Sequence, residues 1–109
     1  MDDVMQATIK QKFLEELNDA ERYIDMCEKA TRDGDKQIFR DIAKEEMTHA
    51  EHLKTIIRGH KIPVTEAEHQ KAQELYKKVK ESFHNMWTDY KEQKSSKLGT
   101  ILDMVTWFL

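Results

Sequence analysis

Apolar side chains recur at intervals of three and four residues along the first half of the chain. This is the spacing of one buried face of an α-helix, and no stretch alternates cleanly between apolar and polar residues as a half-buried strand would. The pattern predicts a first helix from about Asp3 to Thr31 and a second from about Asp35 to Arg58. The expected buried stripes are Ile9, Phe13, Ala20, Cys27 and Ala30 in the first helix, and Ile38, Phe39, Ile42, Ala43, Ala50, Leu53, Ile56 and Ile57 in the second.

A short polar segment is predicted to separate these two helices. Gly34 is expected to end the first helix in the left-handed conformation that glycine adopts easily. Asp35 is expected to cap the start of the second helix through its carboxylate. A connection this short makes the two helices antiparallel neighbours.

A third helix is predicted from near Thr65 to about Gln93, after a break at Gly-His-Lys-Ile-Pro, residues 59–63. Thr65 is a suitable N-cap, and Glu68 three residues later completes the pattern of a capping box. The chain then ends in a compact apolar segment with one charged residue, Asp103. This segment is expected to fold back as a short helix or to dock on a second subunit or another protein partner.

The length of 109 residues supports one domain, 1–109. We divide it into a metal-binding hairpin at 2–59, a third helix at 64–93, and an apolar C-terminal helix or docking tail at 97–109. The expected fold class is all-α, with a ferritin-like antiparallel hairpin and a four-helix core completed by dimerisation. A chain of this size buries a modest core, so oligomerisation would help to stabilise it.

The charge pattern argues against several classes of partner. The net charge is −3, and basic residues alternate with acidic ones rather than clustering, so no nucleic-acid partner is expected.

Cys27 is the one cysteine, which excludes an intramolecular disulfide and fits a reducing compartment; we expect it to be a small buried residue. Neither a signal peptide nor a membrane-spanning stretch is expected, so the predicted location is cytoplasmic.

Polar residues interrupt both apolar stripes at matching places. Glu16 and Tyr23 interrupt the first stripe, and Glu46 and His49 interrupt the second. Burying a carboxylate or an imidazole is costly unless the group is paired or bound to a metal. Glu46 and His49, three residues apart, can reach one cation together, with Glu16 as a third ligand from the facing helix. Such ligands suit iron, manganese or zinc. The alternative is that Glu46 and His49 lie at the edge of the stripe and reach water or an opposing lysine.

Two segments carry a resemblance to a known family. The sequences ELNDAERY at 16–23 and EEMTHAEHL at 45–53 resemble the first helical hairpin of rubrerythrins, in the ferritin-like superfamily. The resemblance covers about residues 5 to 58. It implies a di-iron site in which Glu16, Glu46 and His49 are metal ligands. It also implies a catalytic role for Tyr23, which would lie beside these ligands without binding the metal. The implied cofactor is iron, with manganese or zinc as alternatives.

One copy of the chain contains half of the ligands that a di-iron bundle needs. Such a bundle takes a Glu from each of two helices and a Glu-x-x-His pair from each of two more. Glu81 and His84 repeat the pair, but Val79 and Phe83 mark the opposite side of that helix as buried, so we expect both to be solvated. Two copies related by a two-fold axis are therefore expected to share two iron ions, as in encapsulated ferritins, which the chain also resembles. The expected state is a homo-oligomer, a dimer or a multiple of dimers.

The activity expected from this resemblance is oxidation of Fe(II) by O2 or peroxide, as in a ferroxidase or a rubrerythrin-like scavenger. The chain has no Cys-x-x-Cys pair, so a peroxidase cycle would need an external electron donor. The alternative is a non-catalytic ferritin-like scaffold or interaction module, metal-free or with a structural metal. In that case the third helix and the apolar C-terminal segment would bind partners.

Overall fold

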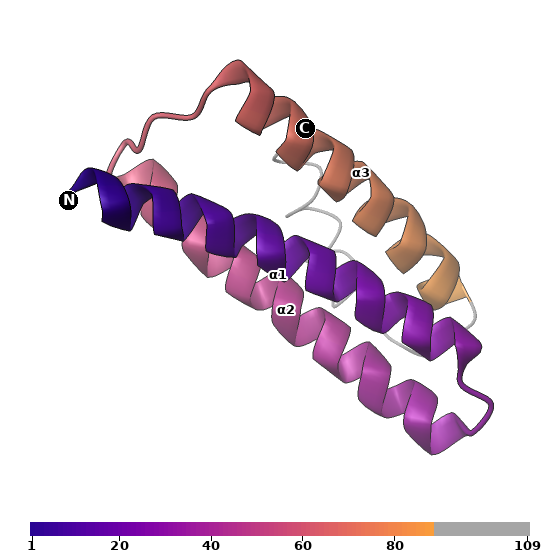
Figure 1. The fold of residues 1–109 in the computed structure, drawn as a ribbon. Helices are drawn as coiled ribbons and strands as arrows, with labels where there is room; N and C mark the ends of the chain where they lie inside the picture. The colour runs from indigo at the N-terminus through magenta and orange to yellow at the C-terminus, as the bar shows by residue number, and fades with distance from the viewer. Residues whose placement is uncertain (89–109) are drawn as a thin grey trace.

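The computed structural model describes residues 1–88, which form three helices and no strand. α1 spans Asp3–Lys29, α2 spans Asp33–Gly59 and α3 spans Glu66–Thr88. α1 and α2 lie side by side as a long antiparallel hairpin, and α3 lies along α1 and runs in the same direction (Figure 1). The all-helical prediction is confirmed for this part of the chain, in which no helix is long and apolar enough to cross a membrane. Residues 89–93 of the predicted third helix and the predicted tail at 97–109 lie outside the described residues.

The connection between α1 and α2 differs from the prediction. α1 ends at Lys29, and Arg32 precedes α2 with an extended backbone and no capping hydrogen bond from its side chain. Gly34 lies in the first turn of α2 and does not have a positive φ, so the predicted left-handed conformation was wrong. The predicted Asp35 cap was also wrong, because the helix begins earlier, at Asp33. Both aspartates instead lie in the first turn, where a negative charge favours the helix dipole.

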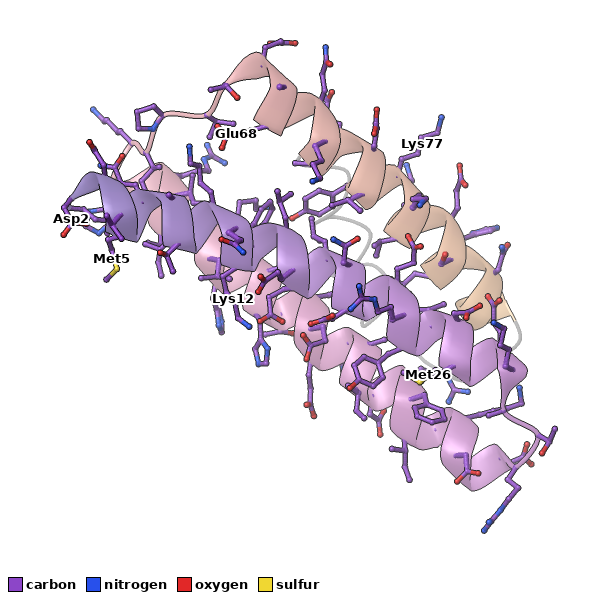
Figure 2. The ribbon with its side chains drawn as sticks, viewed as in Figure 1. Asp2, Met5, Lys12, Met26, Glu68 and Lys77 are labelled. Carbon is purple, nitrogen blue, oxygen red and sulfur yellow. The ribbon has the colours of Figure 1, made fainter. Side chains whose placement is uncertain are left out.

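The predicted capping box at the start of α3 is confirmed. The Glu68 amide donates to Thr65 Oγ1 at 3.2 Å, and the Thr65 amide donates to Glu68 Oε1 at 2.9 Å. Lys10 of α1 also contacts Glu68 Oε1, at 3.0 Å, so the same carboxylate ties the start of α3 to α1. Figure 2 shows Glu68 on the side of α3 that faces the hairpin, whereas Lys77 points away from it.

The core lies where the three helices meet. Alanines on the facing sides of α1 and α2 let the two helices approach closely, and larger side chains from α3 cover the remaining side of α1. The fully buried core residues are Leu17, Ala20, Ala43, Met47, Ala50, Tyr76, Val79 and Phe83. Cys27 is buried as predicted, and its thiol donates to the Lys36 carbonyl at 3.3 Å.

The predicted stripe of α2 is only partly correct. Ile38 and Ile56 are 56% and 38% exposed, whereas Met47, which was not assigned to the stripe, is fully buried. In α1 the unassigned Leu17 and Ile24 are likewise buried. The reason is that the backbone of α3 lies close to α1 and not to α2, which it reaches through side chains such as Tyr76, so one flank of α2 stays open within residues 1–88.

Two buried cations were not predicted. Arg40 is 1% exposed and donates from Nη1 to Gln37 Oε1 at 3.0 Å. Lys54 is 5% exposed, and its ammonium lies 5.8 Å from the centre of the Tyr76 ring. The long aliphatic stems of such residues cover apolar surface, which helical periodicity does not reveal.

Candidate metal centre

The structure brings the three predicted ligands together. Glu16 comes from α1, and Glu46 and His49 come from one side of α2. One ligand atom from each residue lies within 4.8 Å of the other two. This is the one group of three or more acidic, histidine or cysteine side chains in residues 1–88 that is compact enough to hold a metal ion. The sequence does not give the distance between α1 and α2. In the structure the two helices are close enough for the three side chains to hold one ion.

Burial changes steeply across this group. Glu16 is 5% exposed and lies at its base, Glu46 is half-buried, and the side chain of His49 is 54% exposed. The group opens on the side of the hairpin away from α3, where Lys12 also points (Figure 2). A cation can therefore reach a nearly buried carboxylate from an open side.

The Glu16 carboxylate has two different environments. Its Oε1 atom lies 3.3 Å from Lys12 Nζ, and its Oε2 atom lies 3.5 Å from His49 Nδ1. Oε2 is buried and has no hydrogen-bond partner within residues 1–88. Leaving a buried charged oxygen without a donor is costly, and buried polar groups normally have a partner. A metal ion among the three side chains would satisfy this oxygen, so the residues fit a metal.

The two carboxyl groups have opposite pKa shifts. Burial raises the pKa of Glu46 to about 7, and interaction with the neighbouring Glu16 carboxylate adds to the effect. Burial also acts to raise the pKa of Glu16, but interactions with Glu46 and Lys12 outweigh it and lower that pKa below its usual value. At pH values below about 7 the pair therefore holds about one proton, which a metal ion would have to displace.

Lys12 was missed by the sequence analysis. It lies one helical turn before Glu16, and residues four apart on a helix are neighbours, so the spacing was sufficient to find it. Its ammonium neutralises Glu16 when no metal is bound. The Lys12 side chain is 54% exposed, so it can turn towards solvent when a cation takes its place.

Tyr23 lies two helical turns after Glu16 and is half-buried. Its ring packs against Phe39 of α2, with ring centres 6.5 Å apart. No hydrogen bond of its hydroxyl occurs within the described residues. The catalytic role that the resemblance implies for Tyr23 therefore stays a prediction.

The second Glu-x-x-His pair takes no part in the group. Glu81 and His84 are both exposed on α3, as predicted, whereas Phe83 between them is buried. The same residue types at the same spacing thus lie in two environments, and only the pair on α2 has a buried carboxylate from another helix beside it.

The group offers two carboxylates and one imidazole. Three protein ligands of this kind suffice for a single open-sided metal ion, with water completing the coordination. They do not suffice for two ions.

Comparisons of the chain with protein-family models, with curated proteins and with solved structures found no match.

Proposed function

We propose that this chain is a ferritin-like protein that binds two iron ions between two copies of itself and oxidises Fe(II) with peroxide or O2. The observation that carries the proposal is the buried Oε2 atom of Glu16. It lacks a hydrogen-bond partner in residues 1–88 and faces the Glu46 and His49 side chains. The motif resemblance at residues 16–23 and 45–53 supports iron as the metal.

The ligand count supports a site shared between copies. A di-iron bundle needs four carboxylates and two histidines, and one chain brings two carboxylates and one histidine together. A two-fold axis through the open side of the group would double this set. The Glu16 carboxylate, at the base of the group, would then be among the groups that hold the ions.

The surface around the group supports the same arrangement. On both α1 and α2, residues three and four positions apart form a stripe that runs through the ligands, with apolar members on either side of them. These two stripes, which we call the site face, consist of Met5, Ile9, Lys12, Glu16, Asp19, Tyr23 and Met26 on α1, and Ile38, Ile42, Glu46, His49, Leu53 and Ile56 on α2. Met5, Met26, Ile38 and Ile56 are exposed.

The third helix leaves the site face open. α3 contacts the opposite side of α1, where Lys10 lies 3.0 Å from Glu68 and Glu21 lies 3.8 Å from Lys78. Within residues 1–88, Met5, Met26, Ile38 and Ile56 of the site face stay exposed. A second copy placed there would bury them and would bring its own ligands to the same point.

The chemistry proposed for the pair of iron ions is a two-electron reduction of peroxide. Bound iron supplies one-electron redox steps. Two Fe(II) ions held by Glu16, Glu46 and His49 of the two copies would supply two electrons, which with two protons suffice to reduce one peroxide molecule to two water molecules. The carboxyl groups of Glu16 and Glu46 hold the ions and release the proton that they share in the metal-free protein.

Metal content tests this proposal. Protein reconstituted with Fe(II) without oxygen should hold about one iron per chain, since two ions are shared by two copies. A Glu46→Ala, His49→Ala variant should hold none. A Glu81→Ala, His84→Ala variant is the matched control, because it removes the same two residue types from the exposed face of α3, and it should keep its iron.

Adding peroxide to the iron-loaded protein should then oxidise Fe(II) faster than in buffer alone. Equal iron in wild type and in the Glu46→Ala, His49→Ala variant would overturn the metal site. Bound iron that oxidises no faster than free Fe(II) would overturn the catalytic function and favour the scaffold alternative.

A further inference from the structure

Two charged residues of the site face lie on either side of the metal group. On α1, Lys12 precedes Glu16 by four residues and Asp19 follows it by three. Lys12 lies 3.3 Å from Glu16 and points away from α3 (Figure 2). Asp19 is half-buried and lies 3.2 Å from Arg22. One cation and one anion therefore border the ligands on the open side of α1.

Neither charge suits a metal-loaded site in a single chain. A metal ion held by Glu16 would repel the Lys12 ammonium, which contacts the same carboxylate. The Asp19 carboxylate lies close enough to the ligands to act, after burial and Glu16, in raising the pKa of Glu46. The Arg22 side chain that pairs with Asp19 is 74% exposed, and such an ion pair contributes little. Lys12 and Asp19 would each gain from an opposite charge on a second molecule.

A two-fold axis can pair two site faces in two orientations. With the axis along the helices, α1 of each copy faces α2 of the other. With the axis across the helices at Glu16, α1 faces α1 of the second copy in the opposite direction, and residues equally far before and after Glu16 meet. The exposed apolar residues allow both orientations. Met5 would meet Ile56, which lies at the same end of the hairpin, in the first orientation, and Met26 in the second.

The charged residues distinguish the two orientations. The α2 part of the site face has no lysine or arginine, so Asp19 would gain no such cation in the first orientation. In the second orientation, Lys12 comes opposite Asp19 of the second copy. Their distances from Glu16 differ by one residue, or about 1.5 Å along the helix, which the long lysine side chain can span. The two-fold axis forms this ion pair twice.

We propose that the second copy packs with its α1 antiparallel to α1 of the first, and that Lys12 then leaves Glu16 for Asp19 of the second copy. This inference rests on the proposed shared metal site. The exchange removes an ammonium from a carboxylate that the metal needs, so metal binding and pairing of the copies favour each other. In the metal-free single chain, the same lysine neutralises Glu16.

Cross-linking of the full-length, zinc-loaded protein tests the orientation. Chains whose native thiol is removed by Cys27→Ala carry either Met5→Cys or Met26→Cys, both at exposed positions, and the two kinds are mixed. A short bis-maleimide should join one kind to the other. It should not join two Met5→Cys chains, whose thiols would lie about 30 Å apart. A mixture of Met5→Cys and Ile56→Cys chains is the matched control, which only the first orientation would join.

Sedimentation equilibrium with excess zinc tests the ion pair. Asp19→Lys and Lys12→Asp each set like charges against one another, so each should weaken association by about tenfold. The double variant restores opposite charges and should associate more tightly than either single variant. Asp25→Lys makes the same charge change at an exposed position of α1 outside the site face, and it should leave association unchanged.

The outcomes separate this inference from the proposed function. A dimer in which Met5→Cys is joined to Ile56→Cys would overturn the inference and leave the shared metal site in place. A double variant that associates no better than the single variants would do the same. A zinc-loaded protein that stays monomeric would overturn both.

Discussion

Glu46 is half-buried beside the nearly buried Glu16, and its pKa of about 7 means that its proton is gained or lost near neutral pH. Glu16, whose pKa is lowered, stays ionised over the same range. A metal ion can bind both carboxylates only after the shared proton has left. Metal affinity at this site should therefore depend on pH in a way that a fully ionised site would not.

We expect the affinity for Zn²⁺, chosen because it does not oxidise, to fall by about tenfold for each pH unit below about 7 and to level off above about 8. Titration calorimetry in buffers of different ionisation enthalpy should show about one proton released per metal ion near pH 6. The His49→Ala variant should bind more weakly but still release the proton of the carboxyl pair. A proton release of zero near pH 6 would contradict the assignment.

The same pKa shift predicts that Glu46 costs stability in the metal-free protein. The folded-state pKa of about 7 lies above the usual value of 4.5, so the bound proton stabilises the fold fully below the usual value. That contribution is lost as the pH rises through about 7. Glu46→Gln, which cannot ionise, should therefore raise the free energy of unfolding near pH 8 by about 1 kcal/mol, a value reduced from the full shift because the side chain is partly solvated.

Urea unfolding without metal measures this effect. Near pH 5, where Glu46 is protonated in the folded state, Glu46→Gln should change stability little. Glu45→Gln is a suitable control at both pH values, because Glu45 is the exposed neighbour. A destabilised Glu46→Gln variant near pH 8 would mean that the charged carboxylate is favourably paired.

At the scale of the helices, the start of α2 distinguishes the observed fold from the predicted one. Gly34 lies in the first turn of α2 without a positive φ, and a Cβ atom added there would meet nothing within 4 Å. Gly34→Ala should therefore stabilise the protein by about 0.5–1 kcal/mol, since alanine loses less backbone entropy in a helix. The predicted left-handed cap would instead make the same substitution destabilising. Thermal unfolding, followed by circular dichroism, gives the sign.

At the scale of the whole molecule, the exposed isoleucines of the site face test the proposed dimer. Ile38→Glu and Ile56→Glu should leave the single chain folded, because both residues are exposed in it. In a dimer, each would place a charge in the apolar part of the interface, which should weaken association by at least about tenfold. Sedimentation equilibrium of the metal-loaded protein measures this change.

Val64→Glu provides the control for the dimer. Val64 is 47% exposed but belongs to the loop between α2 and α3, outside the site face. It should leave the dimer intact. A monomeric wild-type protein with bound metal would refute the shared site, while leaving the three-ligand group able to hold one ion.

The sequence predicted that Glu16, Glu46 and His49 would come together, because the signal for this grouping is local. Glu46 and His49 lie one helical turn apart in the stripe of α2, and Glu16 interrupts the stripe of α1, so helical phase places them on neighbouring faces. Phase did not reveal that His49 would be 54% exposed. The contact of Lys12 with Glu16 could also have been predicted, since Lys12 lies four residues before Glu16. The burial of Lys54 could not be predicted, because helical phase does not reveal that a charged side chain is covered by a third helix far along the chain.

Helix positions, the capping box at Thr65 and the phase of Glu16, Glu46 and His49 were determined by the sequence itself, since each depends on residues a few positions apart. The tertiary structure alone decided which flank of α2 is covered, how close the three ligands come and how the protons of the carboxyl pair are held. The ligand distances and the state of the carboxyl pair depend on how α1 and α2 pack together. The covered flank of α2 depends on the side of α1 that α3 packs against. That choice leaves Ile38 and Ile56 exposed around the metal group and encloses Lys54 on the other side.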